Sequence, residues 1–129
     1  MIEDIADMLY AKALEKHISF ITTHAYSHDY ISPTGQSDHE YLKKIEKEAE
    51  KNNVKAYFIH LIADDNSILN RIINPSRKEY LKLTDQEIMK ELLQQHDRKT
   101  SADVRNNLTI DTTHLTAEET AEQILNFIQ

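Results

Sequence analysis

The most chemically suggestive stretch of this chain is an apolar run that ends in two acids and is followed by an arginine. The run, at 54–62, is rich in aromatic and β-branched residues, which is typical of a strand buried on both faces of a parallel sheet. Asp64 and Asp65 follow it as helix-capping residues, and Arg71 lies in the short helical pattern beyond them. Because open α/β folds bind ligands at the carboxyl ends of their strands, this order predicts an arginine that faces a ligand.

Histidines form a second group of candidate ligands. His24 and His28 lie four residues apart, next to Asp29, in a polar segment with turn-forming residues. On a helix this spacing would suit a metal ion, but the local pattern predicts a loop and supplies no obvious third ligand. His60 lies inside the apolar run and is expected to be a hydrogen-bonded core or strand-end residue. We therefore expect no metal site, and a histidine-based or metal-dependent hydrolase that uses these four residues is kept only as an alternative.

The single glycine of the sequence, Gly35, restricts the nucleotide sites that this chain can build. A P-loop needs glycines so that backbone amides can approach phosphate, and a Rossmann fingerprint needs them for the same reason. A chain with one glycine cannot contain either motif. A nucleotide site in this chain must therefore do without a glycine-rich phosphate cradle.

Composition and charge predict one soluble globular domain over residues 1–129, of which 40% are hydrophobic and 29% charged. The formal net charge of -7 argues against nucleic acid or an anionic membrane as the main partner. No cysteine is present, which excludes a disulfide framework and a thiolate zinc site. With no apolar run of transmembrane length and no signal-peptide pattern, we expect a cytoplasmic protein without a membrane partner.

Strand and helix patterns alternate along the chain. Short apolar stretches predict strands at 18–23, 54–62 and 108–112. Helical patterns occupy 2–16, the segment capped by Ser37 or Asp38, the segment after Asp65, and the segments after capping boxes at 84–87 and 116–119. This alternation predicts right-handed crossovers and a three-layer α/β domain, in which helices cover both faces of a short parallel sheet of about three strands.

Read together, these marks resemble the second half of a P-loop small-molecule kinase of the shikimate-kinase-like or adenylate-kinase-like type. The matching segments are 58–65, 68–72, the basic stretch that contains Arg77, 108–112 and 115–124. Residues 18–51 resemble the third strand and following helix of that family, so the resemblance covers most of the chain. The first strand, the loop Gly-x-x-x-x-Gly-Lys-Ser/Thr, the first helix and the second strand have no counterpart here.

The resemblance implies ATP with magnesium as a possible cofactor and assigns arginines to it. Arg71 matches the family arginine that borders adenine. Arg77 is a candidate lid arginine in a lid-like helical segment at 74–105, although its spacing departs from the family pattern and Pro75 intervenes. Arg98 or Arg105 would be the second lid arginine.

The resemblance also places Asp111 and Thr112, with Thr113, in the loop that passes the adenine, where the contacts are largely made by the backbone. It assigns no catalytic residue, because the groups that hold the β- and γ-phosphates are missing. An alternative for Arg71 is a surface pair with Asp64 or Asp65, and for the lid arginines it is solvated charge.

Two functions follow as expectations. The first is a kinase-like, truncated P-loop domain that is not catalytically competent alone. The second is a protein-interaction module, because a parallel sheet without its first strands exposes an edge that invites another chain. A homodimer or a complementing polypeptide would cover that edge.

Overall fold

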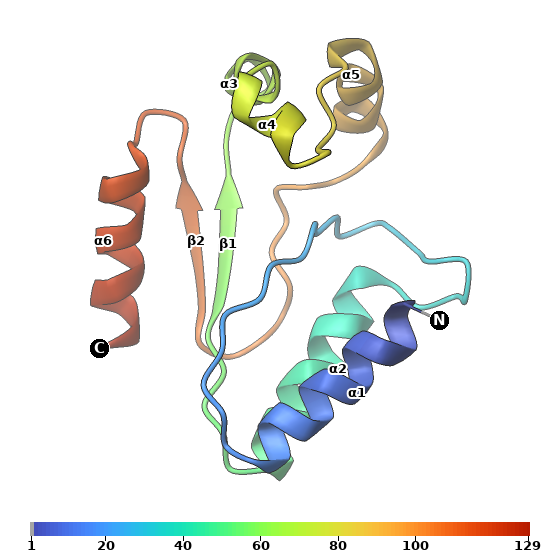
Figure 1. Cartoon of the computed structure of the whole chain (residues 1–129), viewed down its shortest axis with the longest axis vertical. Helices are drawn as coiled ribbons and strands as arrows, with labels where there is room; N and C mark the ends of the chain where they lie inside the picture. Colours follow the sequence, from blue (N-terminus) through green and yellow to red (C-terminus); the bar gives the residue numbers. More distant parts are fainter. Residues whose placement is uncertain (1) are drawn as a thin grey trace.

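A two-stranded parallel sheet forms the centre of the computed structural model, which describes residues 2–129 and the side chains from Ile5 onward (Figure 1). Strand β1 (Phe58–Ile62) pairs with β2 (Asn107–Asp111) in a register that runs from Phe58↔Asn107 to Ile62↔Asp111. The Phe58 N–H donates to the Asn106 carbonyl at 2.9 Å. At the other end, the Thr112 N–H donates to the Ile62 carbonyl at 2.7 Å.

This register leaves one edge of β1 without a partner. In a parallel pair, alternate residues direct both of their backbone groups at the neighbouring strand. Phe58, His60 and Ile62 therefore face β2, whereas the N–H and C=O groups of Ile59 and Leu61 point the other way. Among the described residues, no strand lies on that side. We call this side the free edge of β1.

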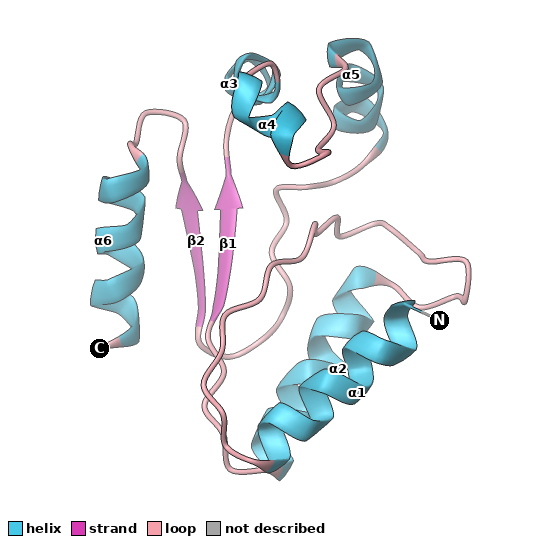
Figure 2. Ribbon diagram, viewed as in Figure 1, coloured by secondary structure: helices cyan, strands magenta, loops and turns pink. Residues whose placement is uncertain are grey.

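Six helices surround the sheet within the described part of the chain (Figure 2). Helices α1 (Ile2–Glu15) and α2 (Asp38–Lys51) pack against each other, and Lys44 Nζ lies 3.0 Å from a carboxylate oxygen of Asp7. Helices α3 (Asp65–Ile72), α4 (Pro75–Glu79) and α5 (Gln86–Gln95) gather beyond the carboxyl end of β1, where α3 contacts α5. Helix α6 (Ala117–Ile128) packs on β2, and the Tyr57 and Phe127 rings meet at 5.8 Å.

Capping explains where several helices begin. Ser37 caps α2 and Thr116 caps α6, each in a reciprocal capping box with the residue three positions later. Asp64 caps α3, as the acids after the apolar run predict. The fourth boundary differs from the prediction by one residue: Asp85, and not Thr84, caps α5, because its carboxylate accepts two N–H groups of the first turn.

The α/β class predicted from the sequence is confirmed, but the sheet has two strands and not about three. Residues 18–23 are predicted as a strand, yet the structure assigns none there. The physical reason is the lack of a neighbour: no strand formed by residues 2–129 lies beside them to pair with their backbone groups, and Ile21 is 98% exposed. The buried apolar side chains among the described residues are correspondingly few: Leu14, Ala49, Ala63, Ile72, Ala102 and Ile110.

No helix in the described range is long and apolar enough to cross a membrane. The segment 74–105 contains α4 and α5 and returns to the amino end of β2. It crosses one side of the sheet before β2 begins, as the orange trace in Figure 1 shows.

Candidate functional site

The carboxyl end of the sheet brings together three of the predicted site residues. The guanidinium of Arg71, on α3, donates from Nη1 to the Thr112 hydroxyl at 2.9 Å and from Nη2 to the Thr112 carbonyl at 2.6 Å. Asp111 lies one residue before Thr112, at the end of β2. Its Oδ1 accepts from the Thr113 hydroxyl at 2.6 Å and from the Thr113 N–H at 3.0 Å.

These contacts give the group a structural role. Hydrogen bonds from Thr113, the hydroxyl first and then the backbone N–H, lower the pKa of the Asp111 carboxyl, so it remains an anion at neutral pH. The guanidinium of Arg71 donates its hydrogen bonds to Thr112, in the chain that leaves β2, and so links α3 to that chain. Its contact with adenine stays a prediction.

We expect Arg71→Ala to reduce the free energy of unfolding by about 1–2 kcal/mol, because it removes hydrogen bonds from a charged donor to Thr112. Urea unfolding followed by circular dichroism measures this. Arg105→Ala is the matched control: the Arg105 side chain is 82% exposed, its pair with Glu50 spans 3.2 Å, and such exposed pairs add little to stability. Equal losses in the two variants would contradict a clamping role for Arg71.

The other predicted arginines are dispersed. Arg77, on α4, donates from Nε to the Leu83 carbonyl at 3.1 Å and closes the turn after that helix. Arg105 precedes the amino end of β2, so the length of β2 separates it from Arg71 at the carboxyl end. Arg98 donates from Nη1 to the Ala63 carbonyl at 2.7 Å and pairs with Asp65.

The free edge of β1 is a second candidate site. The edge runs past Ile59 and Leu61, whose side chains share one face of the strand, and Leu61 is 52% exposed. Ala63 continues the same alternation, so its carbonyl faces the free side, where the Arg98 guanidinium caps it. The chain itself thus covers the end of this edge with a side chain.

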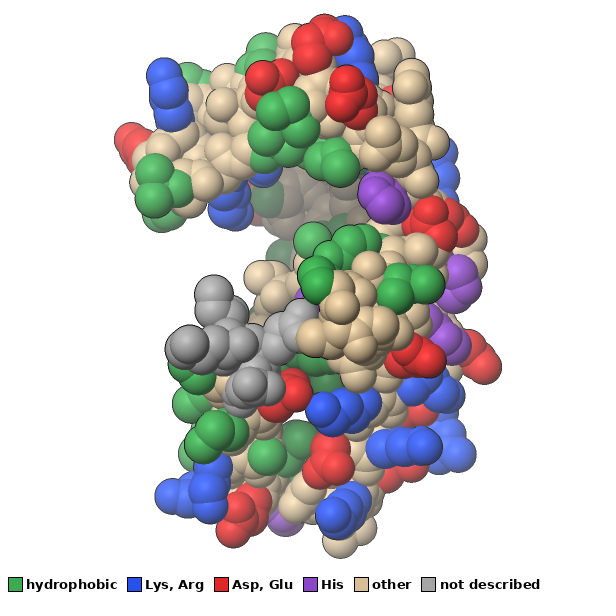
Figure 3. Space-filling model, turned by 90° about the vertical axis from the view of Figure 1, so that its right-hand side faces the viewer, with side chains coloured by type: hydrophobic (Ala, Val, Ile, Leu, Met, Phe, Trp, Pro, Cys, Tyr) green, Lys and Arg blue, Asp and Glu red, His purple; other side chains and the backbone are tan. Residues whose placement is uncertain are grey.

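Exposed apolar side chains occur in the parts of the molecule above and below this edge. Figure 3 views the molecule from the side of Figure 1 on which β1 has no partner, and it shows a deep recess between the upper helices and the lower half. Large apolar residues are exposed in both parts: Ile73, Tyr80, Leu81, Ile88 and Leu92 above, and Ile5, Met8, Leu9, Ile18, Phe20, Ile21 and Ile31 below. Apolar exposure on this scale marks an interaction surface more often than a finished monomer surface.

A histidine-rich group lies where the loop before α2 meets the segment before β2. The Tyr26 hydroxyl lies 2.7 Å from His28 Nδ1, and the Tyr26 ring meets the His60 ring edge-on at 5.5 Å. Burial first, and then the charges of Asp38 and Asp97, raise the pKa of Tyr26, so its phenol stays neutral. No three potential ligands among the described side chains are placed to hold a metal ion. His60 is hydrogen-bonded, as predicted, to the Arg98 carbonyl at 2.9 Å.

The sequence reading missed four members of this group: Asp38, His39, His96 and Asp97. His96 caps the carboxyl end of α5 and Asp97 follows it, far along the chain from the loop, and only the fold brings them to Asp29. The one signal in the sequence is the density of aromatic and histidine residues in the loop.

Acid should weaken this group. Hydrogen bonds from Thr100, the hydroxyl first and then the N–H, lower the pKa of Asp97, and the Asp97 N–H does the same for Asp29. A carboxyl whose pKa is depressed by folding stabilises the fold above its unfolded value near 4, and this contribution is lost as the pH falls through the folded value. We expect the urea concentration at the midpoint of unfolding to decrease when the pH is lowered below about 4. The decrease should be smaller in Asp97→Asn. An equal acid response in that variant would contradict the assignment.

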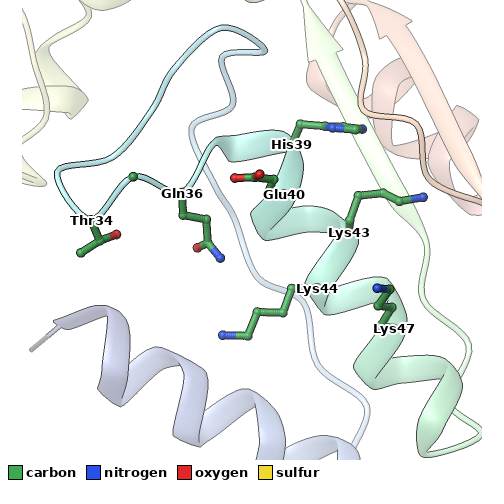
Figure 4. Close-up of a pocket in the computed structure, with 8 residues that line it drawn as sticks. Thr34, Gln36, His39, Glu40, Lys43, Lys44 and Lys47 are labelled. Carbon is green, nitrogen blue, oxygen red and sulfur yellow. The ribbon is translucent and has the colours of Figure 1, made fainter.

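A shallow pocket lies over the start of α2, where Thr34, Gln36 and Glu40 lie near three lysines (Figure 4). Two of these lysines already have carboxylate partners: Lys43 lies 3.3 Å from Glu46, and Lys44 lies 3.0 Å from Asp7. A solvated helix face with its own ion pairs accounts for this pocket.

A comparison of the chain with protein-family models, curated proteins and solved structures finds no match. The function proposed below therefore rests on the residues and their geometry.

Proposed function

We propose that this chain is a protein-interaction module that takes up a β-strand from another polypeptide at the free edge of β1. The added strand would complete a parallel sheet of the kind found in the P-loop kinases that the sequence resembles. The observation that carries the proposal is the edge itself, because Ile59 and Leu61 direct backbone donors and acceptors to a side with no strand. Unpaired strand edges recruit extended segments by main-chain hydrogen bonding.

The predicted third strand supports a single inserted strand as the occupant. Residues 18–23 form no ladder, although their composition favours one. A strand that pairs with β1 on one side would present its other edge for residues 18–23. The completed unit would then be the three-layer, parallel α/β domain expected from the sequence. The recess in Figure 3 has walls on two sides, which suits one extended segment better than the sheet of a second folded copy.

The chain alone is not proposed to transfer phosphate. Its one glycine cannot build the cradle of backbone amides that stabilises phosphoryl transfer. In calorimetric titration with ATP and magnesium we expect no micromolar binding by the isolated chain. Clear micromolar binding would contradict the claim that the isolated chain is inactive and would favour a nucleotide site at Arg71, Asp111 and Thr112.

Amide exchange at single residues tests the edge directly. In the free chain the amides of Ile59 and Leu61 should exchange fast, whereas that of Phe58, which donates to Asn106, should exchange slowly. The probe is a short peptide with a valine- and isoleucine-rich centre and lysine flanks, and an N-methylated copy is the control. The peptide should protect Ile59 and Leu61, and the control should not.

Light scattering identifies the occupant. A monomer with unprotected Ile59 and Leu61 amides supports uptake of a foreign strand. A stable dimer in which these two amides are protected would replace the foreign partner with a second copy. Protection of both amides in a monomer would overturn the proposal, since the edge would then already be covered.

A further inference from the structure

Leu81 has a backbone conformation that its side chain disfavours. It follows α4 with φ 54°, in the left-handed region. Two hydrogen bonds hold it there: the Leu81 N–H donates to the Lys78 carbonyl at 3.3 Å, and the next N–H, of Lys82, donates to the Arg77 carbonyl at 3.0 Å. Glycine or asparagine is usual at this position of a helix end, because a leucine side chain crowds the left-handed backbone.

Two other helices end in the same turn with residues that tolerate it. His17 follows α1 with φ 54°, and Asn53 follows α2 with φ 56°, each with the same pair of hydrogen bonds. An apolar residue comes next in both, Ile18 or Val54, which is where this turn commonly makes its hydrophobic contact with the helix. After α4 the order is reversed: the strained residue, Leu81, is the apolar one, and a lysine follows it.

Leu81 and its neighbour Tyr80 are also open to solvent. Leu81 is 95% exposed and Tyr80 is 72% exposed. We call these two residues the tip. Arg77 holds the turn in shape, since its Nε donates to the Leu83 carbonyl at 3.1 Å. In the free chain neither burial nor backbone preference favours leucine at the strained position. Local conflicts of this kind are typical of functional sites, so the tip indicates a contact made with another molecule.

The tip belongs to the wall of the recess that is nearer the carboxyl end of β1. Helices α3, α4 and α5 gather beyond that end, and Gln86, in α5, donates from Nε2 to the Leu69 carbonyl of α3 at 2.9 Å. In Figure 1 the turn after α4 reaches from the upper helices towards the lower half, on the side of β1 away from β2. In Figure 3 the upper part projects over the mouth of the recess. The carboxyl end of a strand bound parallel to β1 would therefore leave the free edge near the tip.

Cations flank the tip, although the chain as a whole has a formal net charge of -7. Lys78 and Lys82 are exposed, and neither has an ion-pair partner among the described side chains. Arg77 directs its Nε to a carbonyl and not to an acid. Glu79 is the one acid within residues 77–82, and Asp85 accepts hydrogen bonds from the first turn of α5. The tip thus presents apolar surface between unpaired positive charges.

We propose that the tip is a second contact for the polypeptide whose strand β1 takes up, and that it selects a strand followed at its carboxyl end by an apolar and an acidic residue. The inference rests on the strand uptake proposed above. The apolar residue would pack on Leu81 and Tyr80, and the acid would pair with Lys78 or Lys82. Binding would then cover the leucine that the free chain leaves strained and exposed.

Two peptides with blocked ends and the same composition test the selection. Both have the valine- and isoleucine-rich centre. The first has lysines at its amino end and a leucine followed by two aspartates at its carboxyl end, and the second has these flanks exchanged. Both should protect the amides of Ile59 and Leu61. The first should bind about fivefold more tightly, as expected for exposed ion pairs, and the double variant Lys78→Gln, Lys82→Gln should lose this preference.

Leu81→Asn tests the apolar contact. Asparagine tolerates the left-handed backbone, and the side chain that it replaces is almost fully exposed, so the urea midpoint should stay the same or rise. Affinity for the first peptide should fall at least about threefold, because an apolar contact is lost. His17→Asn is the matched control: it makes the same change of residue at the same φ in the turn after α1, and it should leave the affinity unchanged.

The outcomes separate this inference from the strand uptake on which it rests. If neither peptide protects Ile59 and Leu61, strand uptake is wrong and the role of the tip falls with it. If both peptides protect these amides with equal affinity, or if the exchanged peptide binds more tightly, uptake stands and the selection by the tip is wrong. Unchanged affinity in Leu81→Asn, or a lower urea midpoint in that variant, would also overturn the role of the tip.

Discussion

Leu61→Lys is expected to weaken strand uptake at the free edge of β1 at least tenfold. Leu61 is 52% exposed, and its backbone N–H and C=O point away from β2. Lysine at this position must give up its hydration beside an incoming apolar strand, and charged residues on edge strands protect natural sheets in the same way. The measurement is the affinity for the lysine-flanked, valine-rich peptide, with the amide protection of Ile59 as the structural readout.

Leu125→Lys controls for the change of residue type. Leu125 is 54% exposed on α6, which packs on β2 and not on the free edge. Peptide affinity should stay within about twofold of the unmodified chain in this variant, since a surface substitution away from the site changes little. Equal weakening in the two variants would show that the peptide binds exposed apolar surface in general, and the edge would lose its role.

Arg98→Ala is expected to lower the free energy of unfolding by about 2–3 kcal/mol, the largest effect among the arginines. The side chain is 18% exposed, donates to the Ala63 carbonyl at 2.7 Å and pairs with Asp65. Removing it leaves that carbonyl without a partner, and hydrogen bonds that involve a charged group are stronger than neutral ones. Urea and thermal unfolding, followed by circular dichroism, measure the change.

Arg98→Lys separates charge from geometry. Lysine keeps the charge near Asp65 but lacks the planar fork that reaches two acceptors at once, so about half of the loss should remain. The peptide assay adds a second readout, because Arg98 caps the end of the free edge at Ala63. A loss below about 0.5 kcal/mol in Arg98→Ala would show that water replaces the guanidinium at this carbonyl.

The sequence allows local features to be predicted well, because they depend on neighbouring residues. The carboxyl half of the apolar run forms β1, although 54–57 of the strand predicted at 54–62 are not part of it, and the Thr116 capping box begins α6 at the expected residue. Residues 18–23 failed as a strand for a non-local reason: strand propensity needs a neighbouring strand, and none of the described residues supplies one. Composition could not reveal this.

The candidate sites divide in the same way, into contacts that the sequence predicts and contacts that depend on the long-range fold. Arg71 and Thr112 could be predicted to meet, since both follow the carboxyl ends of strands that pair in parallel. The contact between Asp29 and Asp97 could not, because these residues are 68 positions apart and meet only through the path of the chain after α5. Arg98 is a second such case. The sequence shows only a charged residue in a polar stretch, whereas in the structure its guanidinium caps the Ala63 carbonyl at the end of β1.

The pairing of β1 with β2 also has a kinetic consequence. Phe58 and Asn107 are partners, so 49 positions of chain must close before the first rung of the ladder forms. No hairpin shortens this search, and non-local parallel pairing slows folding. The capped helices α3, α5 and α6 need only local contacts and should form first. Until β2 pairs with β1, both edges of β1 are unpaired. A competing strand should therefore bind β1 most readily during folding, before the native ladder is complete.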